Sequence, residues 1–115
     1  MMNTDKIRKM FLDTSAEKIA ELKGKLEEIK KKDGDIRDDL VHDSYILAHS
    51  LHSSSVYLPI RGIILFAKAM ENNVKEWLED GFVLNNQKVD EFIKDVDKLK
   101  TMIDNIDDYF GDTLK

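Results

Sequence analysis

Three histidines, His42, His49 and His52, lie close together in one helix-like segment of the chain. Near neutral pH an imidazole can act as a nucleophile, carry a proton or bind a metal ion. Because His49 and His52 are three residues apart, both rings would lie on one side of a helix and could share a metal ion. A structural zinc ion needs four ligands, however, and the nearby carboxylates lack the spacing of a zinc motif, so a built metal site is not favoured.

The direction of each side chain follows from the helix rotation of about 100° per residue. The predicted core side of this segment holds Leu40, Ser44, Leu47 and Leu51. His49 lies about 200° from Leu47, almost opposite the core, so a packing role for it is disfavoured. An outward stripe lies within about 60° of His49 and consists of His42, Tyr45, His52 and Val56. A surface histidine without a task is the simplest alternative, but exposed aromatic and small residues more often mark a docking surface.

The elements that must position these side chains are helices. Apolar residues recur at spacings of three or four along four segments, about residues 4–31, 35–54, 60–78 and 86–110. Ile36 begins the second apolar stripe, and Leu78 ends the third. No segment alternates apolar and polar residues for long enough to predict a strand.

The joints between these segments are short and carry residues typical of helix ends. Gly34 suits a left-handed cap after the first helix, and Asn85 or Asn86 suits the start of the fourth. Pro59 is expected to separate the second and third helices rather than to kink one long helix. Short joints make neighbouring helices antiparallel, so the sequence predicts an all-α protein, an antiparallel up-down-up-down four-helix bundle.

Composition limits the classes of function. The 115 residues suffice for one domain, expected over residues 1–115. With 18 basic and 23 acidic residues the net charge is −5, which disfavours binding to nucleic acid or to a membrane surface. The absence of cysteine excludes disulfides and thiolate zinc sites. The amino-terminal residues lack the apolar core of a signal peptide, so a cytoplasmic location is expected. The glycine-rich phosphate loop, the nucleophile elbow and the His-Glu-x-x-His zinc motif are all missing.

Two stretches resemble the histidine phosphotransfer (HPt) domain, above all the version at the amino terminus of chemotaxis-type histidine kinases. "LAHSLHSSS", residues 47–55, is similar to the family core of alanine, histidine, any residue and leucine, followed by small residues. "LFAKAME", residues 65–71, is similar to the family's later helix, with Met70 in the leucine place and Glu71 on the glutamate. The resemblance covers the four-helix core and implies the bundle fold.

The resemblance also implies a phosphorelay carrier in two-component signalling. His49 would be the phosphoacceptor, receiving a phosphoryl group from a histidine kinase or a receiver domain and passing it to a receiver-domain aspartate. Glu71 would hold the other ring nitrogen, fixing the tautomer and balancing positive charge. Tyr45, Ser53 and Val56 would belong to the docking face. No cofactor of its own is implied, because the magnesium ion would belong to the partner receiver, and the chain has no ATP-binding loop.

The sequence departs from the family pattern at three positions. The family lysine that neutralises the phosphoryl group is His52 here, which could do so only when protonated. Lys68, three residues before Glu71, is a candidate source of the missing charge. The family glycine that lets the partner approach is Ser53, and a later glycine is Pro59.

These departures leave two functions open. Besides the relay carrier, the chain could be an HPt-like helical adaptor that binds a protein without phosphotransfer. An ordinary i, i+4 ion pair with Lys75 is the alternative role for Glu71. The sequence does not name the kinase, the receiver or the pathway, and it does not indicate an oligomeric state.

Overall fold

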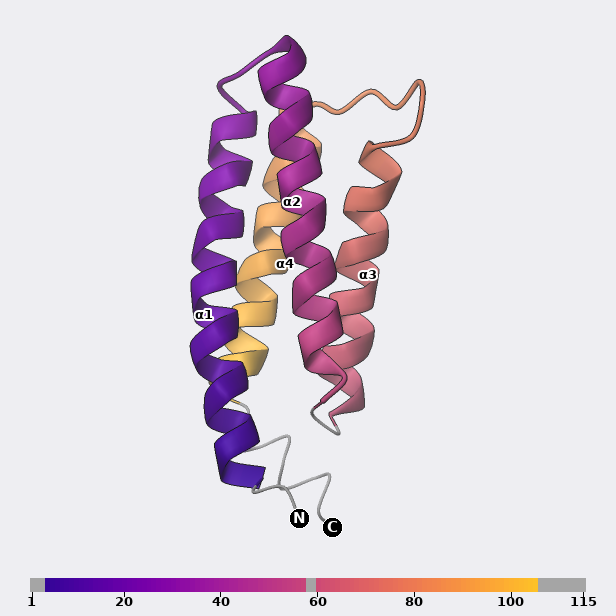
Figure 1. Ribbon diagram of the computed structural model, residues 1–115. Coiled ribbons are helices and arrows are strands. Elements are labelled where there is room, and N and C mark those ends of the chain that lie inside the picture. Colours follow the sequence, from indigo (N-terminus) through magenta and orange to yellow (C-terminus); the bar gives the residue numbers. More distant parts are fainter. Residues whose placement is uncertain (1–3, 58–59, 106–115) are drawn as a thin grey trace.

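The computed structural model describes residues 4–57 and 60–105. Four helices run alternately up and down the molecule: α1 (Thr4–Ile29), α2 (Gly34–Ser55), α3 (Arg61–Trp77) and α4 (Asn86–Asp104) (Figure 1). The bundle measures 48 × 21 × 20 Å. These helices confirm the predicted all-α, antiparallel four-helix bundle.

The helix ends follow the local sequence signals. Gly34 has φ 63° and Gly81 has φ 81°, the left-handed conformation that glycine adopts without steric cost. The side chain of Asn85 caps α4 by accepting a hydrogen bond of 2.9 Å from the backbone of Lys88. The predicted break between α2 and α3 is confirmed, although Pro59 itself lies outside the described residues. The fourth helix was expected to continue to residue 110, but residues 106–110 also lie outside them.

The core runs the length of the bundle and is lined by all four helices. Its fully buried large side chains include Leu22, Leu26, Ile29, Leu51, Ile63, Phe92 and Leu99. Trp77 meets Phe92 edge to face, with ring centroids 5.1 Å apart. Complete burial of one leucine or phenylalanine side chain stabilises the fold by about 1.5–3 kcal/mol before the loss of conformational entropy is subtracted. Because all four helices contribute to this core, its packing sets the position of each helix.

Small residues occupy the buried side of α2. Ser44, Ala48 and Ser55 are at most 1% exposed, and Ala67 on α3 is 2% exposed. The two buried hydroxyl groups donate to carbonyl groups of their own helix, Ser44 to Leu40 and Ser55 to His52. No polar cost therefore accompanies their burial. Narrow side chains let α2 lie close to α3, which places side chains on the outer edges of the two helices within contact distance.

Two residues expected in the core are exposed. Ile36 is 60% exposed, because it lies in the first turn of α2, which extends past the upper end of α1 (Figure 1). Leu78 is 39% exposed, because α3 ends at Trp77 and Leu78 is its C-cap residue. Both predictions extended an apolar stripe beyond the point at which a neighbouring helix can cover it.

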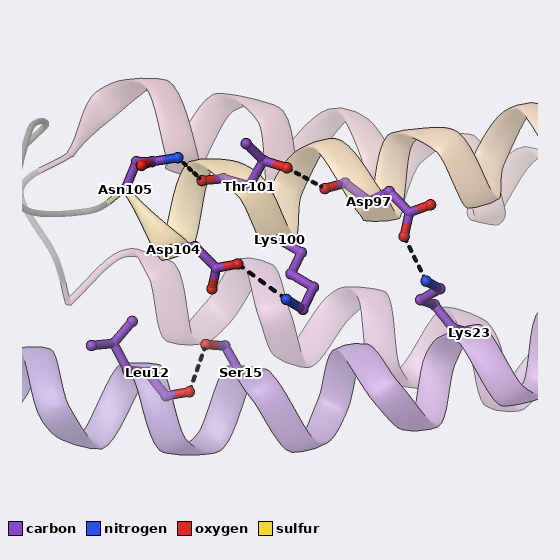
Figure 2. Close-up of polar contacts among 8 residues, drawn as sticks. All are labelled: Leu12, Ser15, Lys23, Asp97, Lys100, Thr101, Asp104 and Asn105. Carbon is purple, nitrogen blue, oxygen red and sulfur yellow. Dashed lines mark hydrogen bonds and ion pairs between the residues drawn. The ribbon is translucent and has the colours of Figure 1, made fainter.

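Charged and polar contacts lie along the outside of α1 and α4. Lys23 on α1 pairs with Asp97 on α4 at 2.6 Å, and Lys30 pairs with Asp90 at 2.7 Å (Figure 2 shows the first pair). Figure 2 also shows the hydroxyl of Ser15 donating to the carbonyl group of Leu12 within α1. Across residues 4–57 and 60–105, no helix is both long and apolar enough to cross a membrane.

Candidate functional site

His49 lies on the outer surface of α2, in the half of the helix nearer its C-terminal end. Its neighbours Ala48 and Leu51 are buried at 1% and 2% exposure, and they fix the rotation of the helix about its axis. The imidazole of His49 is 58% exposed. The outward direction predicted from helix rotation is therefore the observed one, and a partner molecule can reach the ring.

Glu71 of α3 contacts this ring from the side. Its carboxylate is only 14% exposed, and Oε1 lies 2.6 Å from Nδ1 of His49. An ionised carboxylate can only accept a hydrogen bond, so Nδ1 must carry the proton that is shared with Glu71. The neutral imidazole then has its lone pair on Nε2, the nitrogen directed away from the carboxylate. Glu71 contacts imidazoles in place of Lys75, the ion-pair partner that the i, i+4 spacing left open.

His52 shares the same carboxylate oxygen. Its Nδ1 lies 3.4 Å from Oε1 of Glu71, and its side chain is 21% exposed. The longer distance makes this contact weaker than the one to His49. His52 and Tyr45 were expected on an outward stripe, but both are partly buried because that edge of α2 faces α3. The fully outward members of the stripe are His42, His49 and Val56.

Tyr45 and Ser53 flank the exposed ring. The phenol of Tyr45 stacks near the imidazole of His49, with ring centroids 6.2 Å apart and planes inclined by 28°. The hydroxyl of Ser53 lies 3.4 Å from Nε2 of His49, one helical turn further along α2. Val56, the C-cap residue of α2, is 54% exposed. The small polar side chain of Ser53 thus lies beside Nε2, and the apolar Val56 lies about two turns further along the same side of α2.

Lys68 lies on α3 one turn before Glu71, and its side chain is exposed. Since α2 and α3 are antiparallel, Lys68 is roughly level with His52 and Ser53. Among the described residues it makes no ion pair with the site. The structure therefore brings His49, Glu71, His52, Tyr45 and Ser53 into contact and leaves Lys68 and Val56 at the border.

A lysine that sequence reasoning did not single out also reaches this region. Nζ of Lys18, on α1, donates a hydrogen bond to Oγ of Ser50, the residue after His49. The two residues are 32 positions apart, so no local pattern connects them. Only the arrangement of α1 against α2 reveals the contact.

A cavity lies elsewhere on the molecule. It has a volume of about 570 Å³ and is bordered by Arg37, Val41, Trp77 and the loop after α3. Eight residues along α2 separate Val41 from His49, which corresponds to about 12 Å of helix. The histidine site is thus an open surface, whose chemistry needs groups supplied from outside.

No group of three histidine, aspartate or glutamate side chains disposed to hold a metal ion occurs in the part of the chain that the structure describes. His49 and His52 each share a hydrogen bond with the same carboxylate oxygen of Glu71, and the second imidazole competes for the oxygen that a metal ion would need. The geometry is that of a hydrogen-bonded nucleophile.

The comparisons with known proteins agree with this geometry at the level of the family. The family model for the Hpt domain matches residues 6–109, which includes both α2 and α3. No curated protein and no solved structure gives a significant match to the chain.

Proposed function

The chain belongs to the Hpt domain family, whose members are histidine-containing phosphorelay carriers in two-component signalling, and on this basis we propose that His49 is the residue that carries the phosphoryl group. A single observation supports this choice above the others. His49 combines an exposed ring with a carboxylate 2.6 Å from Nδ1, which leaves Nε2 as the nucleophilic nitrogen.

The transfer step balances with the residues of this site. The lone pair of Nε2 attacks phosphorus, and an N–P bond forms as the bond from phosphorus to the donor oxygen breaks. The electron pair stays on that oxygen, which belongs to the nucleotide of a kinase or to the aspartate of a receiver domain. The ring keeps its Nδ1 proton and becomes positively charged, and the carboxylate of Glu71 balances that charge. Transfer from His49 to a receiver aspartate is the reverse of the transfer from a receiver aspartyl phosphate to His49.

The exposure of His49 fits a division of the active site between two proteins. Phosphoryl transfer depends on positioning and on positive charge around the phosphoryl oxygens. The chain supplies the nucleophile and the carboxylate, and a receiver domain would supply the aspartate and a magnesium ion. Tyr45 and Ser53 lie beside the nucleophile, and Val56 lies about two turns further along α2. All three are proposed to contact the partner.

His52 and Lys68 are proposed as supporting residues. A protonated His52 would add positive charge beside the phosphoryl group, although its Nδ1 is directed at Glu71. Lys68 extends from α3 at the same level and could reach the phosphoryl oxygens without a preformed contact. The proposal also takes residues 1–115 as a single HPt domain in the cytoplasm. Its kinase is proposed to be of the chemotaxis type.

The test is to incubate the full chain with a phosphodonor and to measure acid-labile, base-stable phosphate on the protein. We expect the wild type to be labelled and His49→Gln to remain unlabelled, with His42→Gln as the matched control on the same helix. Label retained in His49→Gln would assign the phosphoryl group to another residue. A wild type that no kinase, receiver phosphate or small donor labels would favour the adaptor function.

A further inference from the structure

A lysine from α1 ends beside the proposed phosphoacceptor. Nζ of Lys18 donates to Oγ of Ser50, and the Lys18 side chain is partly buried between α1 and α2. Ser50 directly follows His49 in the chain. The contact brings a positive charge to the site from a helix that contributes none of the residues described above.

Nε2 of His49 is directed toward Ser53, on the side of α2 that also carries Ser50, the residue held by Lys18. Nε2 lies 3.4 Å from Oγ of Ser53, whereas Nδ1 is directed at α3 through Glu71. Ser53 projects about 40° from His49 and about 60° from Ser50, which places it between them on the helix surface. A phosphoryl group on Nε2 would therefore extend toward the groove between α1 and α2, where Lys18 ends.

Among the residues that the structure describes, no carboxylate pairs with Lys18. Lys25 lies two turns further along α1, faces the same groove, and pairs with Asp43 of α2 at 3.6 Å. Lys18 contacts only a neutral hydroxyl group, and none of the ion pairs among the described residues includes it. A lysine has a flexible four-carbon stem, and the Cβ atoms of Ser50 and Ser53 are about 5–6 Å apart, so a short swing brings the ammonium group to Nε2.

We propose that Lys18 is the cation that binds the phosphoryl group on His49. In the unphosphorylated chain its ammonium group is held by Ser50, and after transfer it contacts the phosphoryl oxygens. This inference rests on the proposed function and deepens it. The relay site then extends over three helices: the carboxylate comes from α3, the nucleophile from α2 and a permanent positive charge from α1.

The experiment uses phosphoramidate, a small donor that needs no partner protein. The N–P bond to His49 forms as the P–N bond of the donor breaks and ammonia leaves. The labelling rate is measured for Lys18→Met, Lys18→Arg and the matched control Lys25→Met, and the phosphoryl group is titrated by ³¹P NMR. We expect Lys18→Met to be labelled about fourfold more slowly, the size of a single-charge interaction in water at about 5 Å. Its phosphoryl group should also titrate at higher pH, since a nearby cation favours the more negative form.

Further variants separate charge from structure. Lys18→Arg and Lys25→Met should both resemble the wild type. Ser50→Ala removes the resting contact but keeps the charge, so it should not slow labelling. If Ser50→Ala is as slow as Lys18→Met, the hydrogen bond is structural and Lys18 has no role at the phosphoryl group. If Lys18→Met matches Lys25→Met in rate and titration, the inference is wrong while the proposed function stands. A wild type that gains no phosphate on His49 would overturn both.

Discussion

Nδ1 of His49 and Oε1 of Glu71 lie 2.6 Å apart across the contact between α2 and α3. The two residues are 22 positions apart in the chain, and each stands on a helix whose rotation is fixed by buried neighbours. One ring nitrogen is thus held closely by Glu71, whereas the other has only the long contact of 3.4 Å to the hydroxyl of Ser53, on a ring that is 58% exposed. This division of the imidazole between a structural and a reactive nitrogen gives the site its predicted chemistry.

The charge of Glu71 should matter more than its shape. Glu71→Gln keeps the side chain's size but replaces a charge-assisted hydrogen bond with a neutral one, a loss of roughly 1 kcal/mol. We expect labelling of His49 by phosphoramidate to slow by about fivefold, the rate equivalent of that energy. Glu76→Gln, on the exposed side of α3, is the control and should be unchanged. Equal rates for the two variants would remove Glu71 from the mechanism.

The tautomer of His49 can be observed directly. Glu71 is expected to hold the neutral ring with its proton on Nδ1, so long-range ¹H–¹⁵N spectra should show Nδ1 protonated and Nε2 bare. In Glu71→Ala the ring loses that acceptor, and the proton should move in part to Nε2. A ring already protonated on Nε2 in the wild type would contradict the geometry of the site.

Docking should be separable from chemistry. Val56 borders the site and is 54% exposed, whereas Val83 is 76% exposed in the loop at the other end of the bundle (Figure 1). Val56→Asp should slow transfer between the chain and a phosphorylated receiver domain by about fivefold or more, since an unpaired charge would be buried at the interface. Labelling by phosphoramidate should not change. If Val83→Asp slows receiver transfer as much, the docking face is not at His49.

The core should lose stability when its central aromatic residue is truncated. Phe92 is fully buried against Trp77, so Phe92→Ala should lower the free energy of unfolding by about 3–5 kcal/mol. Urea unfolding followed by the fluorescence of Trp77, the single tryptophan of the chain, measures the change. Val83→Ala should cost less than about 0.5 kcal/mol, as at other exposed positions. A small loss for Phe92→Ala would mean that the core repacks freely.

Lys30 predicts a dependence of stability on alkaline pH. The hydrogen bond to Asp90 raises the pKa of the Lys30 ammonium group above its ordinary value of 10.5. A pKa that is raised on folding adds stability below 10.5, and this stability is lost as the pH rises through the folded value. The difference in unfolding free energy between wild type and Lys30→Met should therefore be constant near neutral pH and shrink above pH 10.5. A difference that does not shrink would assign the effect to the aliphatic stem of the lysine.

Local sequence patterns predicted the helices and the direction of His49, because both depend on neighbours within one or two turns. The cap at Asn85 was predictable for the same reason. Gly34 has the expected left-handed conformation, but it is the first residue of α2 and does not cap α1, which ends at Ile29. The prediction that Ile36 lies in the buried stripe of the second helix was wrong, because α2 continues there past the helices that would cover it. Periodicity describes one helix at a time and does not say where its neighbours end.

The contacts between helices were less accessible to sequence reasoning. The pairing of Glu71 with His49 came from the family resemblance, since spacing alone equally allowed an ion pair with Lys75. The position of Lys18 beside Ser50 had no signal at all, because it depends on how far α1 is shifted along α2. Register between helices is set by the packing of buried side chains over the whole bundle, and a short motif does not contain it.

Two kinds of contact between helices differ in their sensitivity to ionic strength. One kind is the ion pairs to α4, and the other is the hydrogen bond between α2 and α3 at His49. Lys23 and Asp97 form an exposed pair between full charges. Lys30, directly after α1, and Asp90 form a partly exposed one, and salt screens such pairs. The contact from α2 to α3 at His49 is a short hydrogen bond to a largely buried carboxylate, which salt affects little. Concentrated salt should therefore weaken the ion pairs to α4 and leave the hydrogen bond between His49 and Glu71 in place. The two sides of the bundle can thus be perturbed separately without a mutation.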